Sequence, residues 1–175
     1  MKLSDALKLI REIPDFPKQG ILFQDITPLL SDAQAFNTVI THMSNSSSGC
    51  DYVAGMEARG FIFAASIANQ SNRGFIPIRK AGKLPGQTHS EKYGLEYGQD
   101  TLEVHKDACG LNSRVLIVDD VLATGGTACA AIRLIEKTGA SVLKLIFLLE
   151  IEELKGRDII LQQFPRVDIE SLKKV

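Results

Sequence analysis

Val115-Leu-Ile-Val-Asp-Asp-Val-Leu-Ala-Thr-Gly-Gly-Thr127 carries the strongest structural signal in this chain. Its first four residues, 115–118, form an uninterrupted apolar run, which is typical of a strand buried on both faces of a parallel sheet. Asp119 and Asp120 then lie at the carboxyl end of that strand, where open α/β sheets bind their ligands. Their carboxylates can accept hydrogen bonds from sugar hydroxyls or help to hold a divalent cation.

The turn after this strand, Ala123-Thr-Gly-Gly-Thr127, is predicted to bind a phosphate group. Gly125 and Gly126 let the backbone approach a ligand closely. The free N–H groups of a helix start favour a phosphate, and Thr124 and Thr127 add hydroxyl donors. The turn is not a Walker motif, because no Lys follows its last glycine.

A second strand-to-helix turn, Glu57-Ala-Arg-Gly60, lies in a basic part of the chain. Residues 58–90 contain no Asp or Glu, whereas the other 142 residues carry 15 basic and 21 acidic side chains. The basic residues of this stretch are Arg59, Arg73, Arg79, Lys80 and Lys83. Three of these cations fall within five residues at a strand end, which suits a polyphosphate. A solvated basic face is the alternative. Taken with the phosphate turn, the pattern indicates a sugar with phosphate at one end and pyrophosphate at the other, bridged by Mg²⁺.

Composition restricts the class of protein further. The chain has 175 residues, 45% of them apolar and 23% charged, as expected of one domain or of one domain with a small appendage. A net charge of −1 provides no field to attract nucleic acid or an anionic membrane. The longest apolar runs have five residues, far short of the roughly 20 that span a bilayer. Three widely spaced cysteines fit neither a disulfide framework nor a zinc site. With Asp5 where a signal peptide would begin its apolar core, we expect a cytoplasmic protein.

Helices and strands alternate along the rest of the chain. Helices are predicted over 4–13, 31–43, 60–69 and 124–137, and strands over 21–23, 52–55, 74–79, 101–105, 115–118 and 142–150. Residues 80–98 are polar and contain five Gly or Pro residues, so they are predicted to form a functional loop. The alternation predicts an α/β fold with a mostly parallel central sheet flanked by helices.

These motifs resemble those of the type I phosphoribosyltransferases. The adenine-specific members of that family are similar over Pro14–Pro28, Glu57–Gly60, Pro77–Gly86, Leu95–Gly98 and Leu116–Thr127. The resemblance implies the family's fold, with residues 1–30 as an N-terminal helix and hood loop over the base site. Residues 31–175 would form the core, including a flexible lid over 84–98. The implied reaction is purine salvage: the phosphoribosyl group of 5-phosphoribosyl 1-pyrophosphate passes to adenine, forming AMP and pyrophosphate, with Mg²⁺ as cofactor, in a homodimer.

The resemblance also implies a role for each residue around the phosphates and the ribose. Asp119 and Asp120 would bind the ribose hydroxyls. Mg²⁺ would be held mainly by the substrate, with no strong direct protein ligand other than these two carboxylates. The 5′-phosphate would be held by Ala123, Thr124, Gly125, Gly126 and Thr127. Pyrophosphate would contact Arg59, Arg79, Lys80 and Lys83, some of them across a dimer interface. The peptide bond Glu57–Ala58 can be cis in this family.

On the base side, the resemblance implies that Phe23 stacks on adenine while groups of Leu22 and Gln24 bind its edge. Glu96 would act as the acid or base at the purine, with Tyr97 beside it. The family commonly has Arg at the position of Gln24, so the contacts of this side chain stay open.

Two rival functions remain at this point. A 6-oxo purine could replace adenine, because backbone groups and Gln24 can either donate or accept hydrogen bonds. A non-catalytic sensor of phosphoribosyl pyrophosphate that binds nucleic acid is the rival from another class. Such a sensor is expected to carry an added DNA-binding module or a basic face and has no need of Glu96.

Overall fold

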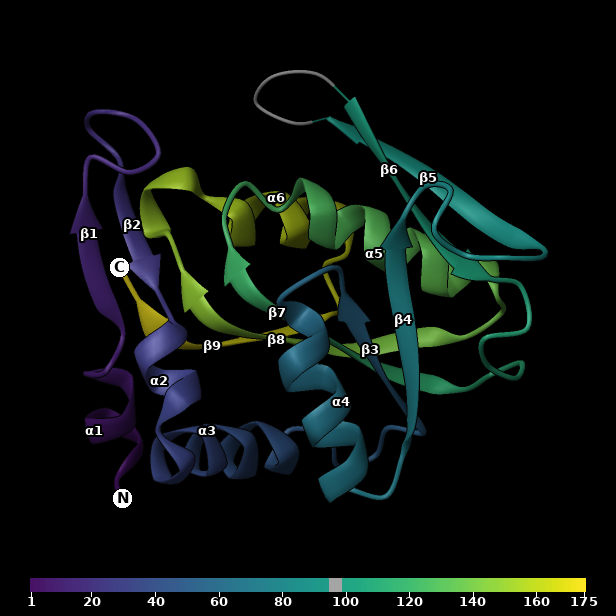
Figure 1. The fold of residues 1–175 in the computed structure, drawn as a ribbon. Coiled ribbons are helices and arrows are strands. Elements are labelled where there is room, and N and C mark those ends of the chain that lie inside the picture. The colour runs from purple at the N-terminus through teal and green to yellow at the C-terminus, as the bar shows by residue number, and fades with distance from the viewer. Residues whose placement is uncertain (95–98) are drawn as a thin grey trace. The chain divides into compact units, whose positions relative to one another are not determined.

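The computed structural model describes residues 1–94 and 99–175 of the chain, and the chain divides into two compact units, Met1–Asn45 and Ser46–Val175 (Figure 1). The N-terminal unit contains α1 (Leu3–Leu7), β1 (Arg11–Pro14), β2 (Leu22–Asp25), α2 (Thr27–Ser31) and α3 (Ala33–Asn45). β1 and β2 pair antiparallel, and α3 packs against α1 and α2. The division therefore falls after α3 rather than after residue 30. The role of the N-terminal segment as a hood stays a prediction.

The predicted helix 4–13 is wrong in its second half. α1 ends at Leu7, and the chain enters β1, where Arg11 donates to Asp25 of β2 at 2.6 Å. Cross-strand pairing thus replaces the helix, which Pro14 could not have continued. The helix predicted over 31–43 is observed as α3, which begins at Ala33. The Asp32 carboxylate accepts a 2.8 Å hydrogen bond from the Ala35 N–H at its start.

The C-terminal unit is built on one sheet. Within the described residues its strands are β3 (Tyr52–Met56), β4 (Gly74–Lys80), β5 (Thr88–Gly94), β6 (Gln99–His105), β7 (Arg114–Leu122), β8 (Ser141–Glu150) and β9 (Asp168–Lys174). The spatial order is β5-β6-β4-β3-β7-β8-β9. The five strands from β4 to β9 are parallel, and β5 and β6 join them antiparallel. The mostly parallel sheet of the sequence prediction is confirmed.

The helices cover both faces of this sheet. α4 (Gly60–Gln70) connects β3 to β4, while α5 (Gly126–Lys137) connects β7 to β8 in the other direction along the sheet. Because such crossovers are right-handed, α4 and α5 lie on opposite faces, with α6 (Gly156–Gln163) on the side of α5 (Figure 1). The strand order reverses between the neighbours β3 and β7, and this switch point is where such sheets bind ligands.

The apolar core of this unit fills the space between the sheet and its helices. Ile117 of β7 and Phe147 of β8 are fully or almost fully buried, together with Ile132 and Ile135 of α5. On the other face, a Cβ at Gly55 of β3 would lie 2.7 Å from the Cβ of Ala64 in α4. Glycine at this position therefore permits close packing of α4 on the sheet, which fixes the start of that helix at the switch point.

The predicted loop 80–98 contains a strand. Residues Thr88–Gly94 pair along their whole length with β6, and Tyr93 is the only one of them that is buried. A strand at the edge of a sheet keeps polar residues, and that composition resembles the composition of a loop. A short 3₁₀ turn, Glu152–Leu154, precedes α6 near the carboxyl end of the chain. None of the helices in the described residues is long and apolar enough to cross a membrane.

Candidate active site

Residues 123–127, which we call the phosphate loop, turn the chain from β7 into α5. Gly125 has φ = +82° and is the N-cap of α5, and its carbonyl accepts the first helical hydrogen bond from Cys129. A left-handed conformation of this kind favours glycine. Ala123, Thr124, Gly125 and Thr127 line a small cavity of about 60 Å³, into which Asp119 also faces. The loop therefore presents the start of the 12-residue helix α5 and two hydroxyls to one small space, an arrangement that suits a phosphate.

Gly156, the first residue of α6, supports the phosphate loop from behind. A Cβ at Gly156 would overlap the carbonyl oxygen of Ala123 and come within 2.8 Å of the Gly125 nitrogen. Arg157 holds this contact in place, because it donates to both oxygens of the buried Glu150 at 2.9 and 2.6 Å and to the Ile169 carbonyl at 2.8 Å. The start of α6 is thus fixed against the backbone of the loop.

Asp119 and Asp120 lie near the end of β7, as predicted. The Asp119 carboxylate accepts a 2.9 Å hydrogen bond from the Asp120 N–H, and Asp120 is only 5% exposed. Burial, reinforced by the negative charge of Asp120, raises the pKa of Asp119 well above its usual value. Burial also raises the pKa of Asp120, although the Arg59 guanidinium opposes this. Sugar hydroxyls or a divalent cation would satisfy such desolvated carboxylates.

Arg59 brings the second turn to this carboxylate pair. Its Nε lies 2.8 Å from the Asp120 carboxylate. The approach is close because the next residue is Gly60, where a Cβ would lie 2.8 Å from the Asp119 carboxylate. The Glu57–Ala58 peptide bond is cis, as the family resemblance implied. The turns after β3 and β7 therefore meet, as the sequence predicted.

Arg79 and Lys80 end β4, and Lys83 follows in the next turn; with Arg59 they form what we call the cation cluster. Glu57 lies among them. One of its oxygens accepts from Lys83 Nζ at 2.6 Å and from Arg79 at 3.4 Å, and the other accepts from the Lys80 N–H at 2.9 Å. Although the stretch 58–90 contains no acid in sequence, the four members of the cation cluster are paired with acids in space.

Lys80 has its own partner on the antiparallel edge of the sheet. Its ammonium lies 3.0 Å from the Asp100 carboxylate, which also accepts a 3.3 Å hydrogen bond from the Tyr93 hydroxyl. A hydrogen bond and the charge of Asp100 raise the pKa of Lys80. Lys80, Asp100 and Tyr93 therefore form a chain of polar contacts along this edge of the sheet.

The base-side residues belong to the N-terminal unit. Leu22 is exposed, the Phe23 ring meets the Phe16 ring edge to face at 5.1 Å, and Gln24 is buried. The Gln24 side-chain oxygen has no hydrogen-bond partner among the described residues. Glu96 and Tyr97 lie outside the described residues.

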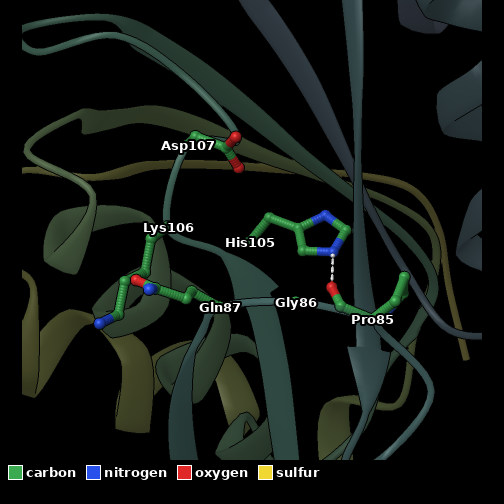
Figure 2. Close-up of a pocket in the computed structure, with 6 residues that line it drawn as sticks. All are labelled: Pro85, Gly86, Gln87, His105, Lys106 and Asp107. Atoms are coloured by element: carbon green, nitrogen blue, oxygen red, sulfur yellow. Dashed lines mark hydrogen bonds between the residues drawn. The ribbon is translucent and has the colours of Figure 1, made fainter.

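A separate open pocket of about 450 Å³ lies where β6 ends, lined by Pro85, Gly86, Gln87, His105, Lys106 and Asp107 (Figure 2). The His105 ring points at the Pro85 carbonyl, with 2.7 Å between Nε2 and the oxygen (Figure 2). The pocket contains none of the predicted site residues. Among residues 1–94 and 99–175, no three His, Cys, Asp or Glu side chains gather as metal ligands.

Sequence reasoning missed three residues of this site. Glu57 was visible as the acid directly before the basic stretch, whereas Gly156 lies outside every segment that the sequence analysis singled out. Asp100 gave no signal, because its contact with Lys80 depends on the antiparallel pairing of β4, β5 and β6. Glu150, at the end of the predicted strand 142–150, is 4% exposed and paired with Arg157.

Comparison with known proteins agrees with this geometry. Residues 29–165 match the family model described as "Phosphoribosyl transferase domain". The chain therefore belongs to the phosphoribosyltransferase family.

Individual relatives show to which members of the family this chain is similar. The chain is 50% identical over 170 residues to the adenine phosphoribosyltransferase of a Cyanothece species, with 96% of this chain and 98% of the relative covered. It is 54% identical over 159 residues to that of a Thermoanaerobacter species, with 90% and 92% covered. The crystal structure of the Thermoanaerobacter pseudethanolicus enzyme superposes with a TM-score of 0.92 at 49% identity, over 99% of this chain and 100% of the other. Within the family, the chain belongs with the adenine phosphoribosyltransferases.

Proposed function

We infer that this chain transfers the phosphoribosyl group of 5-phosphoribosyl 1-pyrophosphate to adenine, forming AMP and pyrophosphate. The observation that carries the inference is the meeting of the phosphate loop, the carboxylate pair and the cation cluster at the switch point of the sheet. The relative from Giardia lamblia, 40% identical and with a TM-score of 0.92, has been crystallised with 9-deazaadenine. That enzyme covers 100% of this chain, with 98% of its own length matched. Similarity to an enzyme that binds an adenine analogue supports adenine as the base.

In this proposal, different groups of the site hold the two ends of the substrate. The phosphate loop holds the 5′-phosphate through backbone N–H groups, and Asp119 and Asp120 hold the ribose hydroxyls. As the bond from ribose C1 to the pyrophosphate oxygen breaks, negative charge grows on pyrophosphate. The preorganised cation cluster stabilises that charge. N9 of adenine then bonds to C1, and its proton passes to a base at the purine or to water. Asp119 and Asp120 also favour the positive charge that develops on the ribose.

Mg²⁺ fits this site as a cation that arrives with the substrate. Two buried carboxylates with raised pKa values, Asp119 and Asp120, offer the oxygen ligands that Mg²⁺ prefers, and it commonly binds one or two carboxylates together with substrate phosphates. When bound, Mg²⁺ neutralises part of the pyrophosphate charge.

On the base side, we propose that Phe23 stacks on adenine and that groups of Leu22 and Gln24 bind its edge. Glu96 acts as acid or base at the purine, with Tyr97 next to it in the lid 84–98. Replacing Glu96 by Ala is expected to lower turnover with adenine by about 10²–10⁴-fold. Full turnover of that variant in a steady-state assay would contradict the role of Glu96.

We also propose that the enzyme is a cytoplasmic homodimer. Ile62 of α4 and Phe75 of β4 are 39% and 38% exposed, and Phe75 meets the Phe61 ring at 5.7 Å, so an apolar patch lies next to the cation cluster. Exposed apolar patches of this kind mark association surfaces. All three cysteines are free thiols, as is usual where cellular reductants keep them reduced. Sedimentation of the purified chain tests the dimer.

One assay tests the function. The enzyme is mixed with Mg²⁺ and phosphoribosyl pyrophosphate, each purine is added in turn, and pyrophosphate release is followed. Release is expected with adenine and not with hypoxanthine, guanine or xanthine. Release with a 6-oxo purine alone would replace the base, and no release with any base would overturn the enzyme assignment.

A further inference from the structure

Glu57 is the one acid within the described residues that contacts two members of the cation cluster through their side chains. Its carboxylate meets Lys83 Nζ at 2.6 Å and Arg79 Nε and Nη2 at 3.4 Å. Only 9% of the Glu57 side chain is exposed, whereas Arg79 and Lys83 expose 33% and 49% of theirs. The carboxylate is therefore largely shielded from solvent, whereas its two partners are partly exposed, and Arg79 also donates to the Lys83 carbonyl at 3.2 Å.

The charge of Glu57 is permanent in the range where enzymes work. Burial raises the pKa of Glu57, but hydrogen bonds from Lys83, the Lys80 N–H and Arg79 outweigh it and lower the pKa to about 2. Pairs with one half-exposed partner contribute little to folding stability. A contribution to anion binding is the role that the position of this carboxylate supports.

Pyrophosphate and Glu57 need the same cations. An anionic oxygen bound to Lys83 Nζ would lie within a few ångströms of the Glu57 carboxylate, and like charges that close together repel each other. The ammonium must leave Glu57, or both anions must share it. Either way, the carboxylate lowers the affinity of the site for pyrophosphate.

We propose that Glu57 is an internal counter-anion of the pyrophosphate site, which competes with pyrophosphate for Lys83 and Arg79 and so promotes its release after transfer. The proposal rests on the function inferred above, since it takes pyrophosphate as the leaving group. Glu57 is a positioning residue in this role: it acts through the two cations and does not touch the reacting atoms.

Direct binding of pyrophosphate, with and without Mg²⁺, tests the proposal by titration calorimetry on the full chain. In Glu57→Gln the shape of the side chain is kept and the charge is lost, so pyrophosphate is expected to bind about two- to fivefold tighter. Product inhibition by pyrophosphate strengthens by the same factor, while the KM for adenine is unchanged. The gain shrinks as salt is added, because ions screen the repulsion.

Glu103→Gln is the matched control. Glu103 lies opposite Arg79 in the β4–β6 register and accepts a 3.1 Å hydrogen bond from the Gly82 N–H. None of the side-chain hydrogen bonds or ion pairs found among residues 1–94 and 99–175 joins it to the cation cluster. This variant loses the same charge nearby and is expected to bind pyrophosphate as the natural chain does. Glu57→Asp moves the carboxylate one methylene back, so its affinity should fall between those of the natural chain and Glu57→Gln.

The outcomes separate this proposal from the function itself. If the natural chain does not bind pyrophosphate, the inferred function fails. If it binds and Glu57→Gln binds equally or more weakly, the counter-anion role is overturned and the function stands. Equal tightening by Glu103→Gln would show a general charge effect and would also overturn the role. Should Glu57→Gln fail to fold, as judged by thermal unfolding, weaker binding by Glu57→Asp overturns the proposal and tighter binding supports it.

Discussion

In the proposed function the phosphate loop and the cation cluster each bind an anion, but they differ in what supplies the positive potential. The loop uses backbone N–H groups and a helix start, and it includes no charged side chain. The cation cluster uses long side chains, each already near an acid: Asp120, Glu57 or Asp100. The difference follows the proposed reaction, because the 5′-phosphate stays on the product AMP and the pyrophosphate must leave. Backbone contacts suit a fixed group, and competing side-chain charges suit a group that is exchanged.

The strongest test of this comparison is Gly156→Ala. The added methyl would overlap the Ala123 carbonyl oxygen and push the phosphate loop out of place. A misplacement of about 1 Å costs roughly 10²-fold, so kcat/KM for phosphoribosyl pyrophosphate is expected to fall about a hundredfold. Steady-state kinetics measure the effect. Gly110→Ala is the control, since its Cβ would meet only the Ser113 hydroxyl at 3.6 Å. A fully active Gly156→Ala would show that the loop is not held by backbone contact.

Asp119→Asn is expected to change the kinetics less than Gly156→Ala does. It should weaken substrate binding and increase the stability of the fold. Loss of the charge weakens hydrogen bonds to the ribose, so the KM for phosphoribosyl pyrophosphate rises about tenfold. Stability increases at neutral pH, because burial and the Asp120 charge raise the pKa of Asp119 in the folded chain, and a raised carboxyl pKa costs folding free energy above the pH at which the unfolded chain loses that proton. An increase in Tm of about 2–4 °C is expected, the shift that 1 kcal/mol produces in a chain of this size.

The pH dependence of unfolding tests the predicted stability gain of Asp119→Asn. A folded-state pKa above the unfolded value means that the folded chain keeps a proton that the unfolded chain has lost, so Asp119 costs stability as pH rises from its unfolded-state pKa towards its folded-state pKa. The Tm gap between Asp119→Asn and the natural chain should therefore close near pH 4. Thermal unfolding at pH 4 and pH 7.5 without Mg²⁺ checks it. A gap that is equal at both values would show that Asp119 is not destabilised by burial.

The smallest effect is expected for Asp100→Asn. Asp100 pairs with Lys80 alone among the cation cluster, so removing its charge should tighten pyrophosphate binding only about twofold. Calorimetry with pyrophosphate measures it, with Asp107→Asn, an exposed acid after β6, as the control. Weaker binding would indicate that Asp100 orients Lys80 for the ligand, and the distinction between a fixed and an exchangeable site would then need revision.

The interior of the sheet could be predicted from sequence, and its edges could not. Buried strands such as Val115–Val118 are apolar throughout, and the glycines after them mark the turn into a helix. β5 and β9 are the edge strands of the sheet, so their residues are mostly polar or exposed. Their composition therefore resembles that of a loop. The predicted site residues near the phosphates were brought together because both turns follow parallel strands. The acids that pair with the cation cluster depend on contacts between strands, which no local pattern encodes.

The glycine contact behind the phosphate loop has a consequence for protein engineering. Residues 123–127 do not form a self-contained module, since their backbone rests on Gly156, which Arg157 ties to Glu150 and Ile169. Transplanting the loop alone into another scaffold would leave its conformation unsupported. A working graft would have to include the start of α6 with its glycine, Gly156, together with Arg157, which anchors it.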